Sequence, residues 1–287
     1  MTRDIGVTDE RERGVRLVPS GERRSAVLGG SRAPRALRRA GGAPCWLSLA
    51  SRDAKAAKEF YERVLGWCHV PLLGSPGTAR SLALKAGAPV GTISEASRDL
   101  GVHAGWMPHF AVDDLDRAVG RIRDRGATVA VGPLTTAAGR AAVAAGPHDV
   151  VFGLRHQALD RRWTVGDGPV ARLELHTGDV FAAALFYGGV LGWAGETGDS
   201  CQVEYTGGRI VVRAGSRPVA ALREDAVPGL EGRHRWHTCF RVADVDATAE
   251  AAVACGGRVI SPPRGSHTPR EAVLADHEGI PFAIVAE

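Results

Sequence analysis

Two nearly identical strings, FYERVLGW at 60–67 and FYGGVLGW at 186–193, lie 126 residues apart in this chain of 287 residues. Each string ends a segment whose apolar residues recur at helical spacing, and a short alternating strand pattern precedes each segment. The surrounding sequence repeats as well, and pairs Asp53 with Asp179, Trp67 with Trp193, Trp106 with Trp236 and Val112 with Val242. A repeat of this length exceeds a solenoid period and indicates two fused copies of one fold.

Each copy contains two smaller units in which a strand, a helix and further strands follow in the same order. In the first copy CWLSLAS precedes the helical pattern RDAKAAKEFYERVLGW, and MPHFAV precedes DDLDRAVGRIRDRG. The sequence therefore predicts an α+β fold of four βαβββ units in two tandem domains. We expect domains at 44–157 and 170–287, joined by a polar linker at 158–169.

Charge is unevenly distributed along the chain. Residues 1–43 hold ten arginines and five acids, whereas the whole chain carries +4, so the remainder carries about −1. This segment lacks a hydrophobic period, and we expect it to be a disordered basic tail. A nearly neutral body argues against a nucleic-acid partner.

Five cysteines without a Cys-x-x-Cys spacing argue against a disulfide framework or a zinc knuckle. No stretch approaches the roughly 18 consecutive apolar residues of a membrane span. We therefore expect a cytoplasmic protein without a membrane partner.

Several strings resemble the vicinal oxygen chelate superfamily: D-x-x-x-A-x-x-F-Y-x-x-V-L-G-W, the helix starts VDDLDRA and VADVDATA, and the closing hairpins GPHDVVFGL and ADHEGIPFAIV. That superfamily includes glyoxalase I, bleomycin-resistance proteins and extradiol dioxygenases. The resemblance covers roughly residues 45–286 and implies glyoxalase-like domains whose paired units form cup-shaped sheets. It also implies that metal-using members take ligands from the first strand and the end of the last strand of a unit.

Transferred to this chain, the first-strand positions fall on Trp46, Met107, Arg172 and His237. The last-strand positions fall near Gly153 and Ala283 and around 91–93 and 220–222, where no side chain supplies a metal-binding oxygen or nitrogen. One imidazole does not hold a transition metal, since even catalytic zinc sites use three protein ligands. We therefore expect no cofactor.

A divalent metal is the alternative, through a shifted set of ligands. Glu174 and His176 follow Arg172 by two and four residues, and His109 follows Met107 by two, so each shares a strand face with that position. The alternative ligands are Glu174, His176 and His237, with His109 as a further member. If the halves exchange units, His109 approaches Glu174; if they do not, His237 does.

The first functional hypothesis is a metal-independent binding protein, monomeric or homodimeric, for a bulky and partly aromatic small molecule such as an anthracycline-like polyketide. Its basis is Trp46, which puts a flat ring at a ligand position, with Met107 facing the same interior. Such a protein would serve antibiotic resistance or natural-product biosynthesis. The expected ligand contacts are Trp46, Ser48, Met107, His109, Arg172, Glu174, His176, His237 and Cys239.

The second hypothesis is an enzyme of the same superfamily, a lyase, isomerase or dioxygenase, with Glu174 and His237 as catalytic residues, with or without a divalent metal. In this hypothesis Arg172 anchors an anion beside an acid/base set; otherwise Arg172 and Glu174 neutralise each other. Cys239 is either activated by Arg241 or an unreactive buried thiol.

Overall fold

The computed structural model describes residues 41–72, 80–96, 104–136, 139–156, 162–193, 200–224, 230–232, 234–265 and 269–287. Residues 1–40 of the expected tail and 158–161 of the expected linker lie outside this part. None of the helices described here is long and apolar enough to cross a bilayer.

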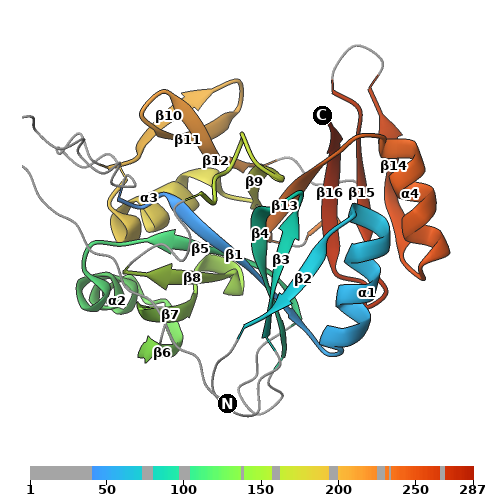
Figure 1. The fold of residues 1–287 in the computed structure, drawn as a ribbon. Helices are drawn as coiled ribbons and strands as arrows, with labels where there is room; N and C mark the ends of the chain where they lie inside the picture. Colours follow the sequence, from blue (N-terminus) through green and yellow to red (C-terminus); the bar gives the residue numbers. More distant parts are fainter. Residues whose placement is uncertain are drawn as a thin grey trace, which may run out of the picture. The chain divides into compact units, whose positions relative to one another are not determined.

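Each half forms one eight-stranded mixed sheet (Figure 1). The first sheet has the order β2-β3-β4-β1-β5-β8-β7-β6 and contains β1 (Pro44–Ser51), β2 (Cys68–Pro71), β3 (Arg80–Lys85), β4 (Ala88–Glu95), β5 (Gly105–Ala111), β6 (Thr128–Thr136), β7 (Gly139–Ala145) and β8 (Val151–Arg155). The second sheet has the order β10-β11-β12-β9-β13-β16-β15-β14 and contains β9 (Val170–His176), β10 (Gln202–Thr206), β11 (Arg209–Ala214), β12 (Arg217–Arg223), β13 (Arg235–Val242), β14 (Arg258–Arg264), β15 (Glu271–Ala275) and β16 (Pro281–Ala286).

The first strands of the two units lie together at the centre of each sheet. β1 pairs antiparallel with β5, and β9 pairs antiparallel with β13. Each of these strands also pairs in parallel with the last strand of its own unit, for example β1 with β4 and β13 with β16. The two halves therefore do not exchange units, and the predicted four-unit, two-domain architecture is confirmed.

The repeated letters begin and end the helices α1 (Ala54–Leu65) and α3 (Val180–Leu191). The carboxylates of Asp53 and Asp179 accept hydrogen bonds from amides of the first turn, which have no partner within the helix. Gly66 and Gly192 follow the last turn with φ of 68° and 75°, a left-handed conformation that favours glycine. The repeat thus specifies two helices with the same start and stop.

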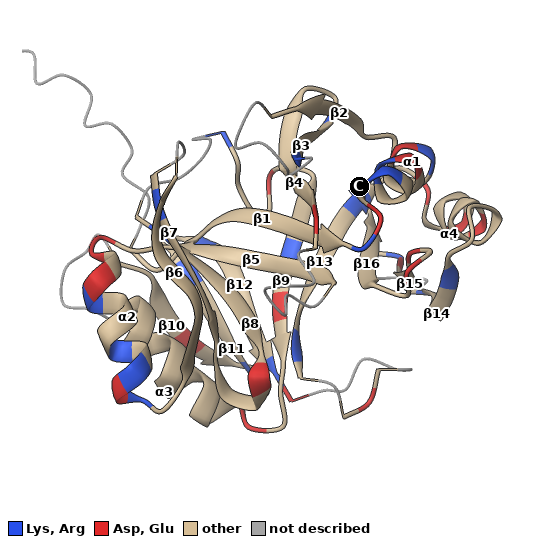
Figure 2. Ribbon diagram, turned by 90° about the horizontal axis from the view of Figure 1, so that it is seen from below, with Lys and Arg blue, Asp and Glu red and all other residues tan. Residues whose placement is uncertain are grey.

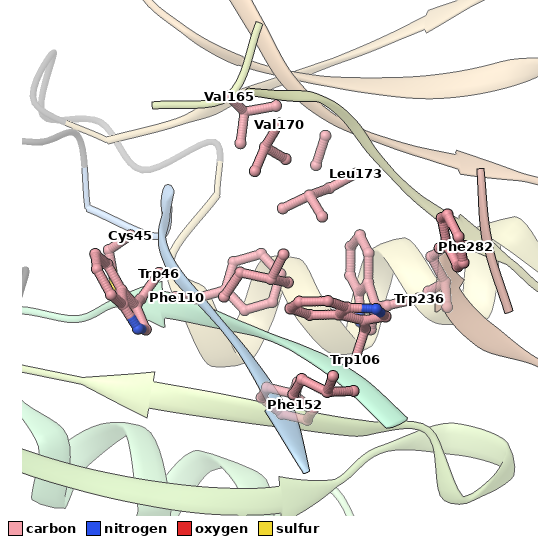
Figure 3. Close-up of a cluster of buried hydrophobic side chains, with 14 of the residues drawn as sticks. Cys45, Trp46, Trp106, Phe110, Phe152, Val165, Val170, Leu173, Trp236 and Phe282 are labelled. Carbon is pink, nitrogen blue, oxygen red and sulfur yellow. The ribbon is translucent and has the colours of Figure 1, made fainter. Parts of the chain in front are cut away.

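The aromatic letters of the repeat join the two halves. Trp67 lies edge-to-face on Phe240 of the second sheet, with ring centroids 5.0 Å apart, and Tyr61 lies 5.6 Å from Phe282. A matching cluster forms around α3, where Tyr187 lies 5.1 Å from Phe152 of the first sheet. Rings from both halves, including Trp106, Phe110 and Trp236, meet in this core (Figure 3).

The remaining helices, α2 (Leu115–Asp124) and α4 (Val245–Ala254), lie beside α3 and α1 respectively. Helix α2 carries acidic and basic side chains, whereas all twelve residues of α3 are uncharged (Figure 2). As a result α3 exposes Phe181 and Leu185, which keep 61% and 78% of their surface accessible.

Candidate functional site

The second sheet gathers the predicted polar residues on the face turned away from the helices, which we call the second cup face. Trp236 and Phe240 of β13 pack against rings of the helical core, so His237 and Cys239, which alternate with them, point the other way. Across the β9–β13 ladder, Glu174 lies opposite His237 and Arg172 opposite Cys239.

Glu174 lies at the centre of a charged cluster on this face. Its Oε1 accepts a hydrogen bond from Nη1 of Arg223 at 3.5 Å, and its Oε2 lies 3.9 Å from Nε of Arg172 and 4.0 Å from Nε2 of His176. Arg172 makes a closer ion pair with Glu271, at 2.5 Å. Arg172 and Glu174 therefore partly neutralise each other, but each has a second partner of opposite charge.

His237 is buried beside this cluster and stays neutral. Only 5% of the residue is exposed, and its ring lies edge-on to that of His176 with centroids 4.7 Å apart. Burial, assisted by the charges of His176 and Arg235, lowers the pKa of His237 to about 3. Its buried Nε2 has no hydrogen-bond partner in the described part of the chain. Such an orphaned polar atom is uncommon in native proteins and is a feature that a bound ligand can satisfy.

Cys239 is an inert thiol in this environment. It is 3% exposed and forms a small apolar cluster with Ala171 and Val285. Burial raises the pKa of Cys239 to about 12 despite the nearby guanidinium of Arg172, so the thiol remains protonated at neutral pH.

A cavity of about 400 Å³ opens on the second cup face. Its apolar lining comes from β9, β11 and β12, at Ala171, Val211, Val219 and Ala221. Charged side chains surround this lining, at Asp167, Arg172, Glu174, Arg209, Arg217 and Arg241. A mostly apolar pocket with a few convergent polar groups is the usual form of a small-molecule site.

On the corresponding face of the first sheet, Trp46 is covered by the chain itself. Trp46, 3% exposed, donates a hydrogen bond from Nε1 to Oγ1 of Thr92 at 2.6 Å. Trp163, which follows the first sheet in the chain, packs on Trp46 with ring centroids 6.2 Å apart. Its Nε1 donates a hydrogen bond to the carbonyl of Val90 at 2.7 Å. Trp46 therefore contacts another tryptophan of the same chain, and Met107 and Ser48 are half-buried nearby on the same face.

His109 lies in the first half, away from Glu174. It is the cross-strand partner of Trp46, and its Nε2 lies 2.8 Å from Oγ of Ser48. A Cβ atom added at Gly153 would lie only 2.0 Å from Nδ1 of His109. The imidazole thus fills the space that a side chain at this family ligand position would need.

The described residues do not fit a divalent metal centre. No group of three histidine, cysteine, aspartate or glutamate side chains among them is placed to hold an ion. A cation beside Glu174 would also face the guanidinium groups of Arg172 and Arg223, which repel positive charge. Glu174, His176 and His237 are neighbours, but they form a hydrogen-bonding and charged cluster rather than an open coordination site.

Sequence reasoning missed Trp163 and three of the arginines around the cavity, Arg209, Arg217 and Arg241. Trp163 was detectable as the one tryptophan in an otherwise polar linker, where a buried partner has to be found for a large ring. Arg209 and Arg217 gave no usable signal, because their placement depends on strand register. Arg241 was named only as a neighbour of Cys239, although it follows His237 and Cys239 at the period of two that puts residues on one strand face.

Comparison with known proteins agrees with this architecture. A family model described as Glyoxalase/Bleomycin resistance protein/Dioxygenase superfamily matches residues 45–154, and one described as Glyoxalase-like domain matches residues 172–285. The chain belongs to the glyoxalase/bleomycin-resistance protein/dioxygenase superfamily, as a tandem of two glyoxalase-like domains.

Among its relatives, the chain is 31% identical over 262 residues to "Anthracycline biosynthesis protein DnrV" of Streptomyces peucetius, covering 85% of this chain and 93% of that one. It is also 31% identical over 252 residues to "Putative glyoxylase CFP32" of Mycobacterium tuberculosis, covering 85% and 94%.

Solved structures of lower identity share the fold. A Mn(II)-bound glyoxalase from Novosphingobium aromaticivorans matches with a TM-score of 0.56 at 17% identity, covering 86% of this chain and 83% of that chain. The 2,3-dioxygenase LapB from Pseudomonas sp. KL28 also matches with a TM-score of 0.56, at 14% identity, covering 87% and 93%.

Proposed function

We propose that this chain is a binding protein that holds a bulky, partly aromatic small molecule in its second half without a metal. The observation that carries the proposal is the cavity of about 400 Å³ on the second cup face, with its apolar lining and its border of arginines. Guanidinium groups stack on aromatic faces, and small apolar side chains such as Ala221 leave room for a flat ring.

The state of His237 favours binding over proton transfer. A general base works best when its pKa lies near the working pH, whereas the pKa of His237 is about 3. A neutral imidazole with an unpaired nitrogen can form a hydrogen bond to a hydroxyl or carbonyl group, but His237 is not among the described residues that line the cavity; it lies across the ladder from Glu174, which does line it.

The relatives indicate the kind of ligand. DnrV and a second Streptomyces protein, DauV, are both named anthracycline biosynthesis proteins. Anthracyclines contain a flat, fused ring system, which matches a cavity with an apolar lining and stacking guanidinium groups. We therefore assign the ligand to anthracycline-like aromatic polyketides and the role to natural-product biosynthesis or resistance.

A fluorescence titration with a flat tricyclic quinone, 9,10-anthraquinone-2-carboxamide, tests this proposal. We expect saturable binding to the wild-type protein and a loss of about tenfold or more in affinity for Ala221→Phe, because the new ring fills the cavity. Ala130→Phe, at an exposed position of β6, is the matched control and should bind normally. Unchanged binding by a folded Ala221→Phe protein would reject the cavity as the site.

The alternative function is an enzyme of the same superfamily. The juxtaposition of Glu174 and His237 across the ladder, with Nε2 of His237 unpaired, is the observation in its favour. Two measurements test it: elemental analysis of protein purified without chelator, and mass spectrometry of the quinone after incubation. A chemically altered quinone whose formation is abolished by Glu174→Gln or His237→Gln would establish the enzyme and replace the binding proposal.

A further inference from the structure

The charged residues around the cavity of the second cup face are predominantly basic. Four arginines line it, together with two acids, Asp167 and Glu174. An apolar ligand alone would not require this number of guanidinium groups, each of which loses hydration when the cavity is covered.

Two of the four arginines already have acidic partners. Arg217 pairs with Asp167 at 2.7 Å, and Arg172 lies against Glu271 at 2.5 Å and Glu174 at 3.9 Å. Asp167 lies in the segment before β9, Glu174 lies on β9 itself, and Glu271 lies on β15, which does not pair with β9. These two arginines are therefore held in place and largely neutralised.

The other two arginines have no carboxylate partner in the described part of the chain. Arg241, half-buried on β13, donates through Nη2 to the main-chain carbonyl of Gly166, which also lines the cavity. Arg209 is exposed at the start of β11, after the turn at Gly207 and Gly208. Arg241 thus already holds one oxygen atom at the cavity wall. Arg209 lies toward the other end of the strands, because it pairs with Arg223 and Arg223 pairs with His176, whereas the amide of Arg241 donates to the carbonyl of Pro169.

We propose that the second cup recognises a carboxylate carried by its aromatic ligand, with Arg241 as the residue that binds it. This inference rests on the proposed function and narrows its ligand class to flat aromatic acids. A guanidinium presents a planar fork of donors that matches the two oxygens of a carboxylate, and such charge-assisted pairs are stronger than neutral hydrogen bonds. The apolar lining then takes the rings of the ligand while Arg241 fixes its orientation.

A pair of probes with one ring system separates the acid from the rings: 9,10-anthraquinone-2-carboxylate and 9,10-anthraquinone-2-carboxamide. We expect wild-type protein to bind the carboxylate about tenfold more tightly than the amide, because a hydrogen bond to a charged group contributes more than one to a neutral group. The preference should weaken as salt is raised, since the pair is partly exposed.

Substitution should remove the preference without removing binding. In Arg241→Gln the affinity for the carboxylate should fall toward that for the amide, while the affinity for the amide changes less than about twofold. Arg258→Gln, at an exposed position of β14, is the matched control and should keep the preference. Arg241→Lys, which keeps the charge but not the fork, should give an intermediate preference.

The possible results lead to different conclusions. Equal affinity of the wild-type protein for both probes would overturn the recognition of an acid and leave the proposed function standing. A preference that persists in Arg241→Gln, with folding verified by circular dichroism, would also overturn it. Failure of both probes to bind the wild-type protein would overturn the proposed function and this inference together.

Discussion

His109 is a titratable side chain that the first sheet keeps in its neutral form. Burial lowers its pKa to about 3, and the nearby positive charges of Arg155 and Arg80 act in the same direction. In the unfolded chain a histidine titrates near its ordinary value of 6.5. Between these values the unfolded state binds a proton that the folded state does not, so the free energy of unfolding falls as the pH is lowered from about 6.5 toward 3.

Replacing His109 tests this pH dependence. We expect the free energy of unfolding of the wild-type protein to fall more steeply between pH 6 and pH 4 than that of His109→Gln, by about 1 kcal/mol per pH unit. Urea titrations at several pH values measure both slopes. His156→Gln, at an exposed position after β8, should keep the wild-type slope. Parallel slopes for the wild-type protein and His109→Gln would show that His109 is protonated in the folded state.

At the scale of single elements, the segment at 162–169 connects the two cups as well as the two sheets. Trp163 fills the first cup against Trp46, whereas Val165, Gly166 and Asp167 border the cavity of the second. Trp163 is 1% exposed. The interior of the first half therefore includes a residue that lies outside its eight strands. The same segment therefore covers Trp46 in the first half and borders the cavity of the second.

Replacing Trp163 with alanine should leave a void beside Trp46 in the first half. We expect Trp163→Ala to lower the free energy of unfolding by about 3–5 kcal/mol, because a large buried ring is lost and a void remains. Added indole, which matches the missing ring, should recover part of this loss. Phe181→Ala, which removes a ring that is 61% exposed, should change stability by less than about 0.5 kcal/mol. Equal effects of the two substitutions in urea titrations would contradict the buried role of Trp163.

Local sequence patterns predicted the elements well but the site only in part. The positions of Asp53, Gly66 and their repeats marked helix ends, because capping depends on neighbours along the chain. Alternation also put Glu174 and His176 on the strand face of Arg172, but it left open whether His109 or His237 lies opposite Glu174. Covering of Trp46 by Trp163 is a tertiary contact, and no periodic pattern encodes it.

At the scale of the whole molecule, the repeat explains how the halves are joined. Aromatic residues of the duplicated helices pack against strands of the opposite half, as Trp67 does on Phe240 and Tyr187 on Phe152. The same letters therefore end a helix and supply the core between the halves. The duplication predicted two copies of a fold, but it did not predict this exchange of contacts, because both copies carry the same aromatic residues and the pattern does not say which half each ring touches.

Polar contacts reinforce this join at the start of α1. Glu278, in the turn before β16, accepts hydrogen bonds from Oγ of Ser51 at 2.5 Å and from the amides of Asp53 at 2.9 Å and Arg52 at 3.0 Å. Burial acts to raise the pKa of Glu278, but the hydrogen bonds from Ser51, Arg52 and Asp53 outweigh it, and the pKa is lowered overall. The second half thus places a carboxylate at the positive end of a helix of the first half.

Glu278→Gln should loosen the coupling between the halves. We expect a loss of about 1–2 kcal/mol at pH 7, because a neutral amide accepts the same hydrogen bonds more weakly and carries no charge at the helix N-terminus. The pKa of Glu278 is lowered on folding, so its contribution is present above the unfolded pKa, and the difference from wild type should shrink as the pH falls through the folded pKa. Glu62→Gln, exposed on the same helix, should leave stability nearly unchanged. Calorimetry provides the second measurement. A single transition in the wild-type protein that broadens or splits in Glu278→Gln would show that this contact couples the unfolding of the two halves. Identical transitions would show that the aromatic core alone couples them.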